Sequence, residues 1–262
     1  ALEEYGADAI RWYFYVNSAP WLPNRFHGKA VTEGQRKFMS TLWNTYAFFV
    51  LYANIDNFDA SKYTLDKDSL SVMDKWLLSK LNTVVKAVDN HLENYRIPEA
   101  ARALQEFVDE MSNWYVRRGR ERFWAKGMEQ DKINAYMTLY TALVTIAKCA
   151  APMVPFMAED IYRNLVCSLD KDAKESVHLC DFPVADANLV DKKLEEDMKK
   201  VAAYKVEDLM SKDIITVNED DSFDYVANVM IKKSINRVPV VDKENFLKGI
   251  ICRYDIIKAM YN

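Results

Sequence analysis

Apolar side chains recur at every third or fourth position along most of residues 32–169, which is the spacing of one face of a helix. Glycine and proline are sparse in the chain, so few residues interrupt this pattern. We predict five helices, over residues 32–55, 71–95, 98–118, 132–151 and 155–169. Amphipathic helices joined by short loops predict an all-α antiparallel bundle.

The first of these stretches combines a helical face with a start signal. Phe38, Leu42 and Tyr46 share one face of the predicted helix. Thr32, followed three residues later by Gln35, resembles a capping box, so we expect the helix to begin there.

The pattern changes after about residue 200. Short β-branched runs alternate with helical stretches, in the order 214–217, 222–233, 237–242, 246–252 and 253–262. This order predicts a small α/β unit of the form β-α-β-β-α. We therefore expect a multidomain chain, with an all-α helical bundle over residues 1–200, the α/β unit over 201–262, and a linker near 198–205.

Charge and composition limit the partners of the chain. The formal net charge is −4 and the pI is near 5.6, so any contact with RNA must come from a local patch. The four cysteines form no CxxC pair and the three histidines are isolated, so we expect reduced thiols and no metal site. No apolar run is long enough to span a bilayer and no signal-peptide pattern opens the chain. We expect a cytoplasmic protein that binds neither a membrane nor DNA.

The stretch "SNWYVRRGRERFW", residues 112–124, holds four arginines and four aromatic residues. At about 100° per residue, Arg118 and Arg122 fall on the apolar stripe of the third predicted helix, whereas Arg117 and Arg120 fall on its polar face. We predict that Arg118 and Arg122 point inward and pair with carboxylates, because an unpaired buried charge is costly. We predict that Arg117 and Arg120 point outward.

Two interpretations of the aromatic residues in this stretch stay open. Trp114 and Tyr115 stand at helical spacing, which is typical of a core, but an exposed aromatic ring can also stack on an unpaired base. From Asn113 to Lys126 five basic residues accompany one acidic residue, which favours contact with phosphate.

Four segments resemble isoleucyl-tRNA synthetases in the same order along the chain: "EEYGADAIRWYFYVNSAPWLPNRF", "SNWYVRRGRERFW", "CAAPMVPFMAEDIYRNL" and "ESVHLCDFP". Together they cover about residues 1–185. The resemblance implies that this part is the helical anticodon-binding domain of a class I synthetase, with the stem-contact region at its start. It implies isoleucine tRNA as the partner.

The resemblance and the charge pattern together give a set of candidate tRNA contacts. These are Arg117, Arg120, Arg122, Trp124 and Lys126. The cations would contact phosphates, and Trp124 would stack on an anticodon base. Arg122 is also a candidate for the inward position.

The catalytic motifs of that synthetase family, HIGH and KMSKS, do not occur in the sequence. "LMSKD", residues 209–213, resembles half of KMSKS but precedes a β-branched run, and we take it as coincidence. Glu159 and Asp160 form a carboxylate pair of a kind that can act in acid–base catalysis. No histidine, metal-ligand cluster or glycine loop lies near them in the sequence, so we do not expect a catalytic site there. We predict no catalytic residues and no aminoacylation by this chain alone.

Residues 205–262 resemble one cystathionine-beta-synthase-type (CBS) motif, through "VEDLMSKDIITVNEDDS", "INRVPVVDKENFLKGII" and "RYDIIKAM". Such motifs work in pairs. Because one copy is present, the resemblance implies that its apolar pairing face binds a second CBS motif, giving a homodimer.

Paired motifs of this family often bind an adenine nucleotide, so AMP, ADP or ATP is a candidate ligand although no cofactor is required. The resemblance places Ile215, Thr216, Pro239 and Asp255 at the nucleotide site. The family pattern has Ser or Thr three residues before the aspartate, but this chain has Cys252, which weakens the expected contact. In the alternative interpretation the first three residues are strand core and a turn.

Two functions from different classes follow. The first is a non-catalytic tRNA-binding part of an isoleucyl-tRNA synthetase with a CBS module for pairing. The alternative is an adenine-nucleotide sensor or dimerisation module, in which the helical part is a carrier in an engineered fusion.

Overall fold

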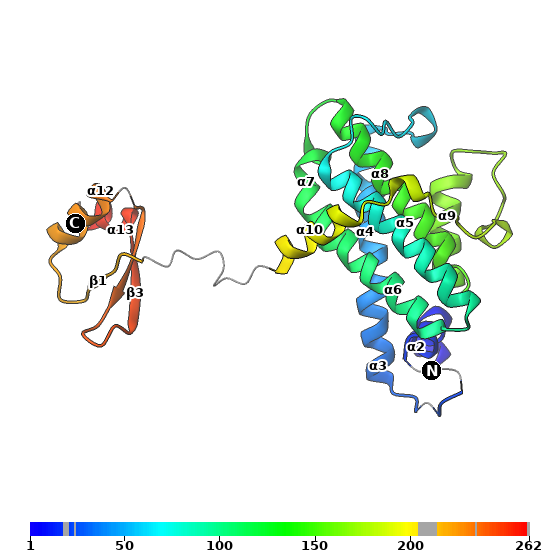
Figure 1. The fold of residues 1–262 in the computed structure, drawn as a ribbon, viewed down its shortest axis with the longest axis horizontal. Coiled ribbons are helices and arrows are strands. Elements are labelled where there is room, and N and C mark those ends of the chain that lie inside the picture. The colour runs from blue at the N-terminus through cyan, green and yellow to red at the C-terminus, as the bar shows by residue number, and fades with distance from the viewer. Residues whose placement is uncertain (18–20, 24, 204–213, 234, 261–262) are drawn as a thin grey trace. The chain divides into compact units, whose positions relative to one another are not determined.

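The computed structural model describes residues 1–17, 21–23, 25–203, 214–233 and 235–260. The chain divides into two compact units, Ala1–Ala202 and Ala203–Asn262. We call them the helical unit and the α/β unit, and each is described by itself (Figure 1).

The described part of the helical unit contains α1 (Leu2–Tyr5), α2 (Ala7–Asn17), α3 (Gly28–Gly34), α4 (Thr41–Asp56), α5 (Val72–Glu93), α6 (Ile97–Glu110), α7 (Arg117–Trp124), α8 (Gln130–Ala150), α9 (Pro155–Tyr162) and α10 (Lys192–Ala203). Three π-helical segments continue these helices: η1 (Gln35–Ser40), η3 (Met111–Val116) and η4 (Arg163–Cys167). Short 3-10 turns are η2 (Ala60–Lys62), η5 (Val177–Leu179) and η6 (Ala187–Leu189).

The five predicted helices are all present, and the π segments join α3 to α4 and α6 to α7 in two long rods. The first rod begins at Gly28, so the predicted capping box at Thr32 is wrong. The Thr32 hydroxyl instead donates to the carbonyl oxygen of Gly28 at 3.1 Å, within the helix. A capping box does form one helix later, where Ser71 and Asp74 cap the start of α5 reciprocally.

One large apolar core holds the helical unit together, with side chains from α2, η1 and α4 to α9. Figure 1 shows α5, α6 and α8 close together in this unit. Trp12 stacks on Phe38 with ring centroids 3.7 Å apart, which joins α2 to the first rod. Leu77, Leu104 and Leu143 are fully buried where α5, α6 and α8 meet. Burying apolar side chains from every helix is the main source of stability of such a bundle.

Two charged residues of α2 hold it against the corner between α8 and α9. Asp8 accepts hydrogen bonds from the backbone N–H groups of Phe156 and Met157, at 3.3 and 2.8 Å, and so caps the start of α9. Arg11 donates to the carbonyl oxygens of Pro152 and Met153 at 2.7 and 3.2 Å. The N-terminal segment is therefore fixed to the bundle.

Helix α10 packs on α5 through a buried carboxylate. Glu195 accepts hydrogen bonds from the hydroxyls of Ser79 and Thr83 at 2.6 and 2.7 Å, and Leu194 and Met198 pack against the core. The predicted linker near 198–205 includes the division between the two units after Ala202, and its residues 198–203 are helical. Its last two residues lie outside the described part of the chain.

The α/β unit contains β1 (Val217–Asn218), α12 (Phe223–Lys232), β2 (Arg237–Val241), β3 (Leu247–Cys252) and α13 (Arg253–Met260). In the described residues this is the predicted order β-α-β-β-α. Strand β1 is shorter and later than the predicted run 214–217. It pairs parallel to β2, with Val217 opposite Val240, and β3 pairs antiparallel to β2. A small core lies around Val226, Met230 and Val238.

Candidate nucleic-acid interface

The rod formed by α6, η3 and α7 carries the basic and aromatic stretch. Arg117, Arg120, Trp124 and Lys126 are all exposed on it or directly after it, which confirms the predicted outward positions of Arg117 and Arg120. None of the three cations forms an ion pair with any described residue. Their charges are therefore available to a polyanion.

Arg118 does not point inward, so that prediction is wrong. The π segment η3 has more residues per turn than an α-helix, which rotates every later residue around the rod. Tyr115 and Val116 at the end of η3 are buried, and so is Phe123 on α7, while Arg118 is exposed. Its guanidinium carbon lies 3.7 Å from the centroid of the Trp114 ring, a cation–π contact.

Arg122 pairs inward with carboxylates, as predicted. Its Nη1 and Nη2 atoms donate to the two carboxylate oxygens of Asp74, each at 2.8 Å. Its Nε and Nη2 atoms also donate to the carboxylate of Asp131 at 2.9 and 2.8 Å. All three guanidinium nitrogens thus donate hydrogen bonds to carboxylates, and Arg122 fixes α7 against α5 and α8. It is therefore a poor candidate for contact with a phosphate.

Asp74 is fully buried and charged. Burial would raise the pKa of its carboxyl, but hydrogen bonds from Arg122, Tyr115 and Ser71 outweigh burial and lower that pKa below its usual value. Burial, together with the Asp74 charge, raises the pKa of the Tyr115 phenol well above its usual value. The phenol therefore stays protonated and donates to Asp74.

The two interpretations of the aromatic residues are now separable. Tyr115 is a core residue, because its side chain is almost fully buried. Trp114 is half-buried against the core and carries Arg118 on its ring. Trp124 is 55% exposed, with its ring centroid 6.5 Å from that of Tyr52 on α4. Of these three aromatic residues, Trp124 is the one with a large accessible ring surface.

A second polar region of the same rod was not among the predicted contacts. Arg36 at the start of η1 and Arg102 on α6 line one cleft, although they are far apart in sequence. Each is a basic residue on the polar side of a predicted helix, and this position in the sequence is only a weak indication of a nucleic-acid contact. That the two helices face each other follows only from the tertiary structure.

In the α/β unit, strand register brings part of the predicted nucleotide site together. Thr216 and Pro239 precede Val217 and Val240, which are paired, so they are neighbours across β1 and β2. Thr216 is exposed, and Ile215 and Pro239 are half-buried.

Asp255 lies on α13, just after the end of β3 that pairs with the start of β2. Arg237, at the start of β2, is opposite Cys252 at the end of β3, and α13 begins directly after it. The exposed Asp255 carboxylate accepts a hydrogen bond from the backbone N–H of Cys252 at 2.8 Å, which uses one of its two oxygens.

The described residues hold neither a cluster of metal ligands nor a membrane-spanning helix. No group of three or more His, Cys, Asp or Glu side chains that could hold a metal ion is found among them. In the same part of the chain, no helix is both long and apolar enough to cross a bilayer.

Comparison with known families defines the class of protein. The family described as "Anticodon-binding domain of tRNA ligase" matches residues 74–227, and the CBS domain family matches residues 206–262. The chain therefore belongs to the family of tRNA ligase anticodon-binding domains, and it also carries a CBS domain.

Its similar relatives are isoleucine–tRNA ligases. The enzyme of Clostridium novyi is 60% identical over 205 residues, covering 78% of this chain and 20% of that protein. The enzyme of Clostridium tetani is 56% identical over 205 residues, which again cover 78% of this chain and 20% of that protein. That of Dehalococcoides mccartyi is 50% identical over 200 residues, or 76% of this chain and 20% of that protein. The chain thus spans about a fifth of the length of these relatives.

One solved structure has a similar fold. It is the crystal structure of a ternary LeuRS–tRNA–LeuAMS complex from Agrobacterium radiobacter K84. The match has a TM-score of 0.53 at 12% identity and covers 91% of this chain and 27% of the other.

Proposed function

We propose that the helical unit binds tRNA, with isoleucine tRNA as the preferred partner, through the exposed face of α7. The observation that carries the proposal is that Arg117, Arg120 and Lys126 are exposed and form no ion pair with a described residue, in the same segment as the accessible ring of Trp124. Cations of this kind contact phosphates, and an accessible indole stacks on an unpaired base. Arg122 acts by positioning α7.

Fluorescence anisotropy with an isoleucine tRNA transcript tests this proposal. We expect R117Q/R120Q to weaken binding and to lower the slope of log K against log salt by about 1.5, since each phosphate contact contributes about 0.7–0.9. The control K86Q/K171Q removes two exposed cations from other elements. A variant that melts earlier and binds as before overturns the assignment.

The preference for isoleucine tRNA rests on relatives that are 50–60% identical. A tRNA with a different anticodon should bind more weakly in the same assay. Equal affinity for both would leave tRNA binding in place and remove the preference.

We further propose that this chain does not charge tRNA by itself. Neither HIGH nor KMSKS occurs in its 262 residues, and these motifs carry ATP chemistry in the family it resembles. An exchange assay with ATP, isoleucine and pyrophosphate should give no signal above background, and measurable exchange overturns the proposal. A cytoplasmic location stays a prediction.

A second candidate function belongs to the α/β unit, namely pairing with a second copy and binding of AMP, ADP or ATP. Large apolar side chains are exposed on this small unit, among them Ile250 and Tyr254, which are 57% and 71% exposed. Such a surface is typical of an interface. We expect sedimentation analysis to find a dimer that I250K dissociates, and a chain that remains monomeric overturns the pairing.

Nucleotide binding is favoured by the neighbouring positions of Thr216 and Pro239 across β1 and β2, and by the exposed Asp255 that follows β3. Equilibrium dialysis with each adenine nucleotide is the test, and D255N should weaken any binding. The absence of binding at millimolar concentration removes this function and with it the sensor alternative.

A further inference from the structure

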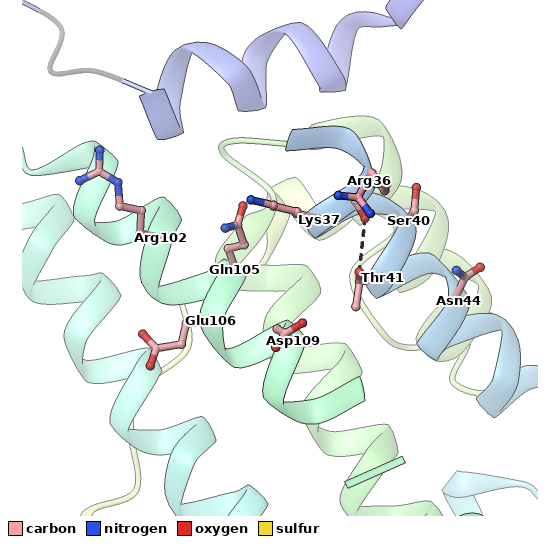
Figure 2. A pocket seen from close by; sticks show the side chains of 9 residues that line it. All are labelled: Arg36, Lys37, Ser40, Thr41, Asn44, Arg102, Gln105, Glu106 and Asp109. Atoms are coloured by element: carbon pink, nitrogen blue, oxygen red, sulfur yellow. Dashed lines mark hydrogen bonds between the residues drawn. The ribbon is translucent and has the colours of Figure 1, made fainter. Parts of the chain in front are cut away.

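A polar cleft of about 620 Å³ lies between η1–α4 and α6 (Figure 2). Basic residues occupy the part nearest the start of both helices: Arg36 and Lys37 come from η1, and Arg102 from α6. The carboxylates of Glu106 and Asp109 lie further along α6. Figure 2 shows Lys37 extending from its helix toward the α6 side of the cleft.

The two arginines of the cleft differ from Arg122, whose guanidinium is paired with carboxylates inside the helical unit. Neither Arg36 nor Arg102 forms an ion pair with a described residue. Arg102 donates one hydrogen bond, from Nη2 to the carbonyl oxygen of Val16 at 3.2 Å. Lys37 is paired with Glu33 at 2.7 Å, so the free positive charge of the cleft belongs mainly to the arginines.

The acidic residues define which part of the cleft an anion can occupy. Asp109 is seven residues beyond Arg102, which is roughly 10 Å along the helix. Its carboxylate accepts a hydrogen bond from the side-chain amide of Asn113 at 2.8 Å. An anion is therefore attracted to the end that holds Arg36 and Arg102 and is repelled from the other end.

The rod of α6, η3 and α7 carries both the α6 side of the cleft and the proposed tRNA contacts. Beyond Asp109, the exposed residues of the rod are Asn113, Arg117, Arg118, Arg120, Glu121 and Trp124. From Arg102 to Trp124 the rod is about 33 Å long.

The first rod follows the same line. Its Arg36 lines the cleft, and further along α4 the ring centroid of Tyr52 lies 6.5 Å from that of Trp124. The two rods are therefore in contact at the cleft and again at Tyr52 and Trp124, and exposed arginines lie near both places.

We propose that this cleft seats the sugar–phosphate backbone of the bound RNA, with the guanidinium groups of Arg36 and Arg102 on its phosphates. The proposal rests on the proposed tRNA binding and extends it to a second contact region. Arginines on two separate helices can each hold a phosphate of one backbone by charge-assisted hydrogen bonds, and the fixed helices set their spacing. Contacts of this kind position the RNA and carry no sequence information.

The test uses the full chain and an isoleucine tRNA transcript, with affinity measured by fluorescence anisotropy at several salt concentrations. We expect R36Q/R102Q to weaken binding at least tenfold and to lower the salt slope by about 1.5. R36K/R102K keeps the charge and should recover part of the affinity, and K86Q/K171Q is the matched control. Melting temperatures verify that each variant is folded.

A second measurement needs no substitution. Phenylglyoxal modifies accessible arginines, and peptide mass spectrometry reads each site. Bound tRNA should protect Arg36 and Arg102 as strongly as it protects Arg117.

The outcomes separate the two proposals. If the unmodified chain binds tRNA but R36Q/R102Q behaves like the control and both arginines stay reactive, the cleft proposal is wrong while tRNA binding stands. If the unmodified chain binds no tRNA, both proposals fall.

Discussion

Asp74 holds the guanidinium of Arg122 through two parallel hydrogen bonds of 2.8 Å, across 48 residues of sequence. Asp74 caps the start of α5 at the same time, and its carboxylate also accepts from the phenol of Tyr115. One buried carboxylate therefore fixes the start of α5 and the basic helix α7 in a single arrangement. The exposed arginines of α7 depend on it for their position.

Loss of this ion pair should destabilise the helical unit. We expect R122Q to lower its free energy of unfolding by about 3 kcal/mol, because the variant leaves the Asp74 charge buried without its cation. R118Q removes an arginine that is exposed on the same helix and should cost less than about 1 kcal/mol. Urea denaturation followed by circular dichroism measures both. Equal costs would mean that the Asp74–Arg122 pair is not an important stabilising contact.

Asp74 should also make stability depend on pH. Its pKa is lowered in the folded chain and is about 3.9 when unfolded, so its contribution is fully present above that value and is lost as pH falls through the folded pKa. D74N removes the contribution. The difference in unfolding free energy between the unmodified chain and D74N should be constant from about pH 5 to pH 8 and shrink below about pH 4. A difference that grows in acid would contradict this sign.

Glu195 should control how firmly α10 is attached. Burial would raise the pKa of its carboxyl, but hydrogen bonds from Ser79 and Thr83 lower it, so the charged form is bound in the structure. We expect E195A to speed hydrogen exchange of α10 amides about tenfold, with little change elsewhere, because removing the acceptor costs about 1.4 kcal/mol. The neighbouring E196A removes an exposed carboxylate and should leave exchange unchanged. Equal acceleration in both variants would rule out the buried anchor.

The cysteines should differ in reactivity. Burial raises the pKa of the Cys149 thiol to about 12, and the thiolate is the reactive form. Iodoacetamide at about pH 8 should therefore modify the half-exposed Cys167, Cys180 and Cys252 in the native chain and leave Cys149 unmodified. In denaturant all four should react. Peptide mass spectrometry gives each rate, and fast labelling of native Cys149 would show that its site opens readily.

The sequence was sufficient for the order of the elements. Each predicted helix in residues 32–169 exists because its apolar positions repeat with the helical period, and a side chain such as Leu104 has one face on which to be buried. The order β-α-β-β-α was predictable for the same reason, from alternating runs of β-branched and amphipathic sequence.

The sequence did not predict which way each side chain points around a helix after a π segment. A count of 100° per residue assumes an unbroken α-helix, but the π segment η3 lies between the core contact of Phe107 and Arg118. The same count correctly placed Arg122 toward the bundle, where its side chain is 18% exposed and pairs with Asp74. Packing of Tyr115 and Val116 against other helices decides the phase, and these contacts are not local.

The sequence by itself determined the family, the helical and α/β character of the two units, and a basic stretch that faces outward at Arg117 and Arg120. Only the tertiary structure decided which charged side chains form ion pairs within the fold and which stay accessible to a ligand. Arg122 is neutralised by Asp74, while Arg36 and Arg102 face one cleft without carboxylate partners among the described residues. The physical reason is that a side chain is free or paired according to its neighbours in space, and those come from helices far apart along the chain.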